Sequence, residues 1–274
     1  MTEPVVVRSP DLDLRKIAES GQCFRLLPED GGYVLTALGR VLHLRPLPDG
    51  AEFLCSRTEF DAVWSAYFDL NTDYARFRSR VVREDRFLTA AADYGRGIRI
   101  LRQDPWEMLV TFLISQRKNI PAIRSCVEKL CALCGEPLPD GRFAFPTAER
   151  VAALRPEELS ACSLGYRADY VRGAARLTAE GPLDPARLSG LADGELLDAL
   201  EQTPGVGPKV ASCVALFGYH RLTGFPLDVW MRRVAEREYG GAFPVERYAG
   251  FAGVLQQYLF YYARSGGLAA ASGD

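Results

Sequence analysis

The sequence has no long hydrophobic run. No stretch of its 274 residues reaches the roughly 18 consecutive apolar residues that a membrane-spanning helix requires. The first residues also lack the apolar core and the small-residue cleavage site of a secretion signal. Both absences argue against a membrane or secreted protein, and we expect a protein of the cytosol.

A regular set of cysteines is absent as well. The seven cysteines are odd in number and scattered, which favours reduced thiols over a disulfide framework. The tightest group is Cys126, Cys131 and Cys134, which has no histidine nearby and no fourth cysteine before Cys162. We therefore predict that these thiols pack as small apolar side chains of a helix and that the chain binds no zinc.

An excess of positive charge is also lacking. The formal net charge is −2, whereas domains that bind nucleic acid are usually basic overall. The distribution is more informative, because the basic residues between positions 95 and 124 outnumber the acidic ones. They are Arg96, Arg99, Arg102, Arg117, Lys118 and Arg124, against Asp104 and Glu107. Solvated helix surfaces explain this cluster as well as a local nucleic-acid-binding face does.

What is present predicts a globular protein of the α+β class. Residues 34–54 contain short β-type runs separated by Gly and Pro turn signals, which indicates an antiparallel sheet. Helical spacing begins at residues 60–68 and dominates from Pro105 onward. We predict an N-terminal antiparallel β-sheet domain with helices at 1–95, a two-lobed all-α domain at 96–265, and a disordered tail at 266–274. The later helices are expected at 105–116, 121–134, 147–154, 156–162, 167–179, 193–202, 209–219, 228–239 and 245–264.

The segment 200–233 carries the most chemical information. It predicts a helical hairpin at about 193–219 whose turn, Pro204-Gly205-Val206-Gly207, is followed at once by a new helix. The two glycines permit close backbone approach, and the helix start presents unpaired amides. Such a turn suits a phosphate, although an ordinary pair of packed helices also explains it.

Lys209 is in an unusual place for a lysine. It stands in the first turn of that helix, where the positive end of the helix dipole disfavours a cation and favours the neutral, nucleophilic amine. Cys213 lies four residues on, on the same helix face, and Asp228 takes the capping position of the next helix. Taken singly, a solvent-exposed lysine and a structural cap are sufficient explanations. Together the three residues predict one pocket that holds an amine, a carboxylate and an apolar thiol.

These residues resemble the motifs of the helix-hairpin-helix base-excision DNA glycosylases. In that superfamily a hairpin L-P-G-V-G-x-K is followed about nineteen residues later by the Asp of P-x-D-V, and this chain has TPGVGPKVA and PLDV. Over nearly its whole length the chain is similar to the bacterial type of 8-oxoguanine DNA glycosylase. Four further blocks carry the likeness: GQCFR at 21–25, LRQDP at 101–105, LGYRADYV at 164–171 and LQQYLF at 255–260.

The resemblance implies a lyase chemistry and a purine pocket. Lys209 is implied as the nucleophile that forms a Schiff base, and Asp228 as the carboxylate that orients the attack and stabilises positive charge on the sugar. The lesion is expected to contact Gly21, Cys213, Pro226, Gln256 and Phe260. Of these, the Gly21 carbonyl would accept from the ring N–H that guanine lacks, Cys213 and Phe260 would enclose the base, and Gln256 would bind its pairing edge. A turn, a core aromatic and a surface amide are the structural alternatives for Gly21, Phe260 and Gln256.

The resemblance also implies contacts with the duplex. The amides of Gly205, Gly207 and Val210 are expected to hold a phosphate, and Tyr166 and Arg167 to enter the duplex beside the vacated position. Other DNA contacts are expected from Arg117, Asn119 and Trp230. Main-chain carbonyls of Glu201, Thr203 and Val206 are expected to bind a monovalent cation, Na⁺ or K⁺, while no cofactor is required.

Three positions depart from the eukaryotic relatives. Arg117 stands where those relatives have an asparagine that fills the gap left by the extruded base. Ala122 replaces an arginine that reads the opposite cytosine, and Trp230 replaces a histidine near the phosphate of the lesion. We therefore expect relaxed selectivity for the opposite base.

Three other functions fit these residues less well than 8-oxoguanine excision does. Iron–sulfur relatives need four cysteines near the C-terminus, but no cysteine follows Cys213, so no cluster is expected. An alkylpurine DNA glycosylase would usually lack Lys209, and a non-catalytic helix-hairpin-helix module would have no use for the pocket. The expectation is a bifunctional DNA glycosylase and AP lyase, acting as a monomer on double-stranded DNA that contains 8-oxoguanine, in the nucleoid-associated cytoplasm.

Overall fold

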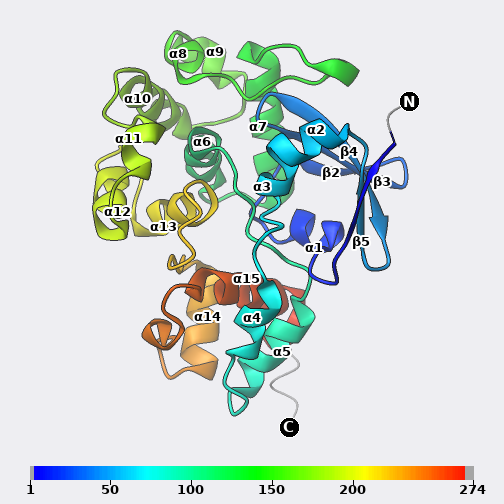
Figure 1. Cartoon of the computed structure of the whole chain (residues 1–274). Helices are drawn as coiled ribbons and strands as arrows, with labels where there is room; N and C mark the ends of the chain where they lie inside the picture. Colours follow the sequence, from blue (N-terminus) through cyan, green and yellow to red (C-terminus); the bar gives the residue numbers. More distant parts are fainter. Residues whose placement is uncertain (1–2, 269–274) are drawn as a thin grey trace.

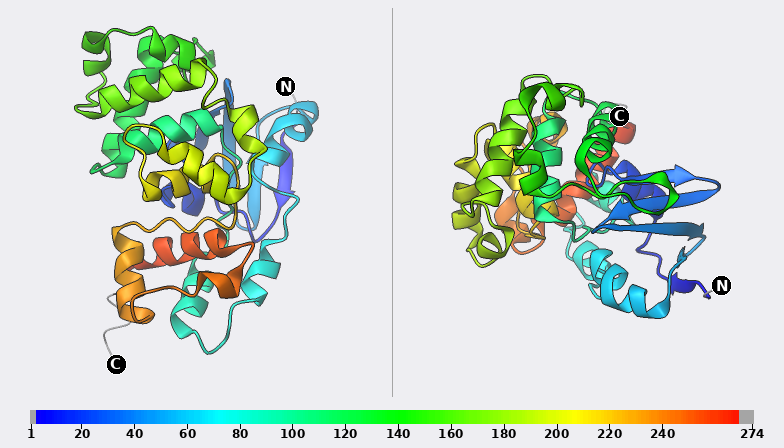
Figure 2. Two further views of the ribbon diagram at one scale, coloured as in Figure 1. Left: turned by 90° about the vertical axis from the view of Figure 1, so that its left-hand side faces the viewer. Right: turned by 90° about the horizontal axis from the view of Figure 1, so that it is seen from above.

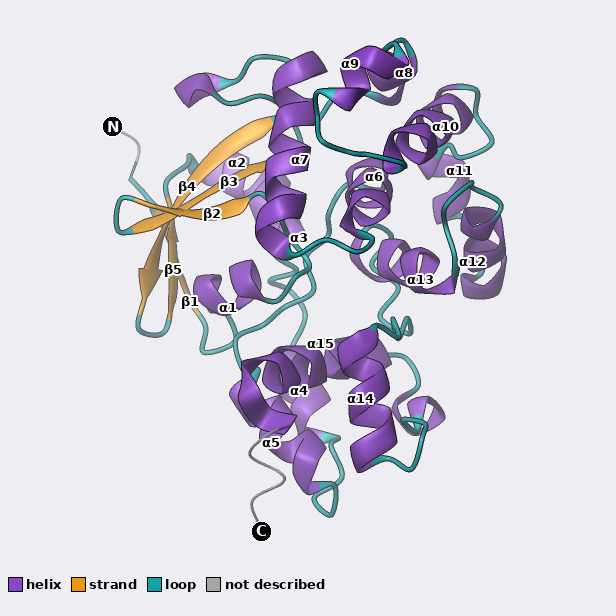
Figure 3. Cartoon of the chain, turned by 180° about the vertical axis from the view of Figure 1, so that it is seen from behind, coloured by secondary structure: helices purple, strands orange, loops and turns teal. Residues whose placement is uncertain are grey.

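The computed structural model describes residues 3–268 and has an antiparallel sheet to one side of a larger helical body (Figure 1). The five strands have the order β1-β5-β4-β3-β2. They are β1 Val5–Arg8, β2 Leu26–Glu29, β3 Gly32–Ala37, β4 Arg40–Leu47 and β5 Gly50–Phe53. Seen from behind, all strands lie at one side of the molecule (Figure 3). The predicted α+β class with an N-terminal antiparallel sheet is confirmed, and β1 and β2 extend the sheet beyond the range 34–54.

Two-residue turns fix the register of the sheet. Asp30 and Gly31, between β2 and β3, both have positive φ, and so do Leu38 and Gly39 between β3 and β4. Such turns match the right-handed twist of antiparallel strands. One face of the sheet packs on short helices, α1 Leu14–Glu19, α2 Arg57–Glu59 and α3 Ser65–Tyr67, with the π-helical turn Phe60–Trp64 between the last two.

The helical body has two lobes that share one continuous hydrophobic core. We name them the hairpin lobe and the terminal lobe, and Figure 2 shows the sheet beside the hairpin lobe. The hairpin lobe contains α6 Pro105–Ser115, α7 Ile120–Cys134, α8 Ala148–Ala152, α9 Pro156–Ser160, α10 Arg167–Ala179, α11 Pro185–Ser189, α12 Asp193–Glu201 and α13 Pro208–Phe217. The terminal lobe contains α4 Tyr74–Ser79, α5 Arg86–Tyr94, α14 Val229–Glu238 and α15 Ala252–Tyr262.

Several boundaries differ from the sequence prediction. The helix expected over 245–264 is interrupted, because Val245–Tyr248 forms a 3₁₀ turn and Gly250 adopts a positive φ of 89° before α15 begins. The range 1–95 includes α4 and α5, yet the buried residues of these two helices belong to the core of the helical body. Of the tail predicted at 266–274, Leu268 is buried at the end of a π-helical turn, Ala263–Gly267, and residues 269–274 lie outside the described part.

A buried amide network joins the sheet domain to the helical body. The Gln22 side chain donates to the Arg99 carbonyl at 2.8 Å and accepts from the Leu101 amide at 2.9 Å. Gln103 in turn donates to the Gln22 carbonyl at 2.8 Å. Because both glutamines are buried, these bonds are strong constraints on the chain. They fix the position of Gly21, which precedes Gln22. Across residues 3–268 no helix combines the length and the apolar character that crossing a membrane requires.

Candidate active site

The hairpin between α12 and α13 has a turn whose second residue, Gly205, has to be glycine. Gly205 has a φ of 85°, and a β-carbon there would lie 2.4 Å from the Tyr170 ring. Gly207 has an ordinary extended φ and precedes α13 as its N-cap residue, with open space where a β-carbon would stand. Pro208 occupies the first helical position. The amides of the first turn of α13 therefore face outward without intrahelical acceptors, which is the arrangement that binds a phosphate.

Lys209 and Asp228 come together at the starts of two helices. Lys209 lies in the first turn of α13, half-buried, with its Nζ 5.3 Å from the centre of the Phe112 ring. Asp228 caps α14 and accepts a hydrogen bond from the Met231 amide at 2.8 Å. Burial raises the pKa of Asp228, while the α14 amides and the nearby Lys209 oppose that rise. The site therefore holds a partly desolvated carboxylate beside an amine, without a direct ion pair between them among the described contacts.

Two adjoining cavities open on this pair. The wider one, about 410 Å³, lies where the two lobes meet the segment between α1 and β2. The narrower one, about 60 Å³, continues inward. Both are lined by Gly21, Phe112, Lys209, Asp228 and Phe260. A nucleotide that entered the wider cavity would therefore meet the amine and the carboxylate on the way to the narrow one.

We call the narrow cavity the slot, because residues of α13 and α15 both line it. Cys213, which is 3% exposed, lines it from α13, and Phe260 lines it from α15. Burial raises the pKa of the Cys213 thiol, which favours its neutral, apolar form. Gly21 has a φ of 75°, and a β-carbon on it would lie 3.3 Å from Phe260 Cε1, so glycine allows this wall to approach.

Amide groups line the inner part of the slot. Gln256 is 3% exposed and donates from Nε2 to the Pro226 carbonyl at 3.2 Å. Its Oε1 accepts from Gln257 at 3.1 Å. Gln256 is therefore a buried, oriented amide rather than a surface one. Since Pro226 also lines the slot, the residues that the sequence assigned to the lesion are gathered at one cavity.

Five side chains are expected to contact the duplex, and we call them the rim residues. Two of them, Asn119 and Trp230, line the wider cavity, whereas Arg117, Tyr166 and Arg167 do not. Tyr166 is 51% exposed, whereas Arg167, expected to enter the duplex, is 7% exposed. The Arg167 guanidinium donates to the Gln116 carbonyl and, at 3.2 Å, to the Leu164 carbonyl, and it also lies 4.4 Å from the centre of the Tyr166 ring. Arg167 thus supports Tyr166 instead of projecting from the surface, because main-chain carbonyls already occupy its donors.

The other rim residues are placed differently from one another. Arg117 is exposed at a positive φ of 53°, in the turn between α6 and α7. Asn119 is also exposed, but its side chain caps α7 by accepting from the Ala122 amide at 3.0 Å. Trp230 lines the wider cavity and lies 5.3 Å from the Arg233 guanidinium. Of the three side chains, that of Arg117 is exposed and neither caps a helix nor lines the wider cavity.

Sequence reasoning missed several residues of the site. Phe112 contributes to both cavities and stacks on Phe217 with ring centres 5.5 Å apart. Gln116 donates to the Gly205 carbonyl at 3.1 Å and so connects the end of α6 to the hairpin turn. Arg264 lines the wider cavity from beyond α15. Phe112 is one apolar residue in an apolar helix, so no pattern distinguished it from the core.

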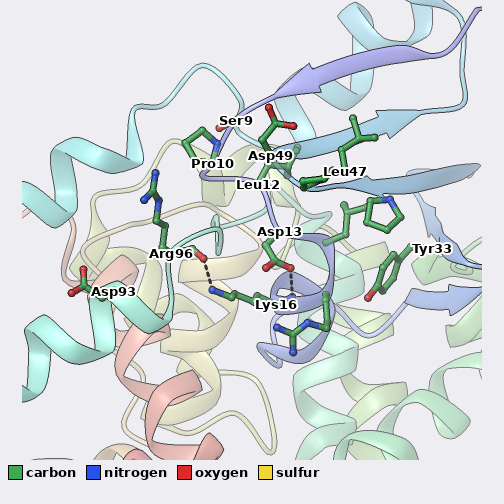
Figure 4. A pocket seen from close by; sticks show the side chains of 15 residues that line it. Ser9, Pro10, Leu12, Asp13, Lys16, Tyr33, Leu47, Asp49, Asp93 and Arg96 are labelled. Carbon is green, nitrogen blue, oxygen red and sulfur yellow. Dashed lines mark hydrogen bonds between the residues drawn. The ribbon is translucent and has the colours of Figure 1, made fainter.

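A further cavity lies away from this chemistry. It measures about 600 Å³ and is bounded by α1, the turn between β4 and β5, and the residues around Arg96 (Figure 4). Its charged side chains are of both signs, and Lys16 already donates to the Tyr94 and Arg96 carbonyls at 2.8 Å each. It contains none of the residues expected to carry chemistry. In residues 3–268, histidine, cysteine and carboxylate side chains form no group of three or more suited to a metal ion.

Fold and site together define a helix-hairpin-helix DNA glycosylase. Two family models match consecutive parts of the chain: "8-oxoguanine DNA glycosylase, N-terminal domain" over residues 5–109, and "HhH-GPD superfamily base excision DNA repair protein" over residues 110–242. The chain belongs to the 8-oxoguanine DNA glycosylase family of the HhH-GPD superfamily.

Solved structures and a curated relative agree with this membership. A structure of MBOgg1 with a low-affinity DNA ligand has a TM-score of 0.90 at 34% identity and covers 97% of this chain and 99% of that one. The Clostridium acetobutylicum 8-oxoguanine glycosylase/lyase, in complex with double-stranded DNA containing cytosine opposite 8-oxoguanine, has a TM-score of 0.88 at 32% identity, covering 97% and 98%. A probable N-glycosylase/DNA lyase of Methanothermobacter thermautotrophicus is 28% identical over 260 residues, 83% of this chain and 81% of that relative.

Proposed function

We propose that this chain removes 8-oxoguanine from double-stranded DNA and then cuts the strand through a Schiff base on Lys209. One observation carries the proposal: an amine at a helix start, Lys209, and a capping carboxylate, Asp228, line both the wider cavity and the buried slot that adjoins it. A module that only bound DNA would need the hairpin turn but not Lys209, Cys213 and Gln256 around a slot.

The hairpin and the rim bring the duplex to the slot. Outward-facing amides at the start of α13 hold a phosphate, and Tyr166 occupies the position that the extruded nucleotide leaves. Extrusion costs a few kcal/mol of stacking and pairing, which contacts with the flipped base offset. Cys213 and Phe260 enclose the base, and Gln256 bonds to its pairing edge. The carbonyl of Gly21 accepts the N–H that distinguishes 8-oxoguanine from guanine.

The chemistry then proceeds at the sugar. The lone pair of neutral Lys209 forms a bond to the anomeric carbon as the N-glycosidic bond breaks, and the base leaves with the electron pair of the broken bond and takes up a proton. Opening of the sugar ring converts the amine adduct into an imine. Loss of a proton from the neighbouring carbon expels the 3′ phosphate by β-elimination. The ionised Asp228 stabilises the positive charge that develops on the sugar.

The end of α12 suits a monovalent cation. Helix carbonyls converge there at the negative end of the dipole, and the Thr203 hydroxyl is buried without a hydrogen-bond partner. The Thr203 carbonyl accepts from the Val206 amide at 2.9 Å and has a second lone pair, so the main-chain oxygens of Glu201, Thr203 and Val206 would bind the ion. We include Na⁺ or K⁺ here as part of the proposal, together with a place of action at the nucleoid.

Borohydride trapping tests the covalent step. The wild-type chain incubated with an 8-oxoguanine duplex and borohydride should form a stable protein–DNA adduct, and Lys209→Gln should form none because it lacks the amine. Lys118→Gln is a matched control, since Lys118 lines the same wider cavity from the other wall. Absence of an adduct with the wild type, or an undiminished one with Lys209→Gln, would refute the assignment.

The lesion and the opposite base need a separate experiment. Excision should be measured on 8-oxoguanine placed opposite each of the four bases, with an alkylated purine duplex as the comparison. Ala122 offers no side-chain donor to the opposite base, so we expect rates opposite cytosine and adenine to agree within about threefold, since a lost hydrogen-bond contact is worth about 1–3 kcal/mol. A strong preference for cytosine would contradict the relaxed specificity, and preferred release of the alkylated purine would contradict the lesion.

A further inference from the structure

Arg264 is a charged residue of the site to which the family motifs give no role. It follows α15, in the turn Ala263–Gly267, and lines the wider cavity together with Lys209 and Asp228. Its side chain is exposed and contributes to the lining of this cavity. It is thus a cation in the wall of the wider cavity, which the nucleotide must enter.

Two contacts hold this arginine in place. Its Nη1 donates to the Glu19 carbonyl, the end of α1, at 3.0 Å. Its guanidinium carbon lies 5.8 Å from the centre of the Phe260 ring, within the range of a cation–π contact. Because both contacts constrain a long side chain, the charge has a defined position next to the slot.

Asp228 is surrounded by few positive groups. From its own helix it faces the amides of Trp230 and Met231, from α13 it faces Lys209 and the Cys213 thiol, and from the turn after α15 it faces Arg264. Burial raises the pKa of Asp228, and the amides, Lys209 and Arg264 each oppose that rise.

The positive charge of Lys209 is absent when the attack on the sugar begins. Lys209 attacks only as the neutral amine, so its charge no longer supports Asp228 when the attack begins. Arg264 keeps its charge at every working pH. The helix amides and Arg264 then remain to hold Asp228 ionised.

We infer that Arg264 is a positioning residue that keeps Asp228 in its carboxylate form while Lys209 is neutral, acting through space from its anchor between Glu19 and Phe260. The inference rests on the proposed function, because it concerns the attack step of that reaction. It is distinct from a DNA contact, which would strengthen binding without changing the charge of Asp228.

The chain contains a matched control for the anchor. Arg124 donates from Nη2 to the Ala18 carbonyl at 2.9 Å and so holds the same end of α1. Among the described residues it does not line the wider cavity and is not one of the charges that act on Asp228, although its charge and that of Arg264 repel each other. Arg124→Gln should therefore disturb the helix end while leaving the charge next to Asp228 intact.

The first test is the pH profile of single-turnover excision, from about pH 5 to about pH 9. Arg264→Gln should move the acidic limb upward by a few tenths of a pH unit, so that the rate on that limb falls about twofold. Because Lys209 must also be neutral for the attack, the second test is needed to assign this shift to Asp228. Arg264→Lys should restore the limb, and Arg124→Gln should leave it at the wild-type position. A limb that does not move in Arg264→Gln would overturn the inference.

The second test does not depend on catalysis. In the Lys209→Gln background, which imitates the neutral amine, the carboxyl of Asp228 can be titrated by ¹³C NMR. Adding Arg264→Gln should raise its midpoint by a few tenths of a pH unit, whereas adding Arg124→Gln should not. An unchanged midpoint would overturn the inference even if excision is confirmed. A wild type that fails to excise 8-oxoguanine would instead refute the proposed function, and the NMR titration would still decide the role of Arg264.

Discussion

Two neighbouring residues on the rim, Tyr166 and Arg167, divide one task. The exposed ring of Tyr166 lies against the Arg167 guanidinium. That guanidinium donates to the main-chain carbonyls of Gln116 and Leu164, which belong to two different segments of the chain. Hydrogen bonds from a charged donor to buried carbonyls are worth more than neutral ones. Arg167 is thus a structural support, and Tyr166 is the surface that the duplex meets.

The division predicts opposite behaviour for two substitutions. Arg167→Gln should lower the free energy of unfolding by about 2–3 kcal/mol, because it removes charge-assisted bonds to buried carbonyls. Tyr166→Ala should change stability by less than about 0.5 kcal/mol but slow excision about tenfold, because it removes a stacking surface. Urea unfolding and single-turnover excision measure the two effects. A large loss of stability in Tyr166→Ala would contradict this assignment.

The residues of the site differ in how well the sequence predicted them. Lys209, Cys213 and Asp228 follow from local spacing, because a helix face and a cap are local properties. The orientation of Arg167 does not, since its acceptor at Gln116 lies 51 residues away in the chain. The resemblance supplied its role in relatives, but here the partners of the side chain decide where it points. Arg264 belongs to no motif, and only the folded arrangement of α14 and α15 brings it to the cavity that Asp228 also lines.

At the scale of elements, the hairpin turn shows two glycines with different physical reasons. Gly205 packs against the Tyr170 ring and has a positive φ. A side chain there would overlap the ring, and its backbone conformation would be strained. Gly207 has open space around it and an ordinary φ, so the fold does not require glycine there. Its small size matters only to what approaches from outside.

Alanine substitutions should separate these reasons. Gly205→Ala should destabilise the protein by at least about 2 kcal/mol through strain and overlap with the ring. Gly207→Ala should change stability by less than about 1 kcal/mol, yet weaken duplex binding about tenfold because its methyl group stands where a phosphate approaches. Thermal unfolding and fluorescence anisotropy measure the two quantities. Equal destabilisation by both substitutions would refute the distinction.

Element prediction succeeded where periodicity was local and failed where packing decided. α10 was predicted with its observed limits, and α6 and α13 within two residues. The break before α15 was missed because Tyr248, Ala249 and Phe251 keep an apolar pattern on both sides of Gly250, although Ala249 is extended and Gly250 has a positive φ. α5 lies in a range assigned to the sheet domain, because nothing in its own sequence shows that its apolar face packs on α15.

At the scale of the whole molecule, a buried carboxyl lies at the joint between the sheet domain and the helices. Glu107, in the first turn of α6, is 7% exposed, and burial raises its pKa to about 7. Its nearest opposing charge is Arg25, which comes from the sheet domain and pairs with Glu128 at 2.8 Å. The joint therefore contains a group that changes charge near neutral pH.

The raised pKa has a definite sign for stability. Between the unfolded pKa near 4.3 and about 7 the folded state binds the additional proton, so stability falls as the pH rises through this window. Glu107→Gln should remove the penalty, raising the free energy of unfolding at about pH 8 by up to about 3 kcal/mol and leaving it nearly unchanged near pH 4. Urea unfolding across this range measures it, and a variant that keeps the wild-type pH slope would contradict the prediction.

The inner wall of the slot is made by the end of the described chain, since Gln256 and Phe260 lie on α15. A ribosome adds roughly 5–20 residues per second, and earlier segments fold first. The hairpin that holds Lys209 is therefore synthesised some seconds before the wall that admits a damaged base. A chain synthesised only as far as α14 has the nucleophile without the slot that selects its substrate, so the order of synthesis itself withholds activity until α15 has been made.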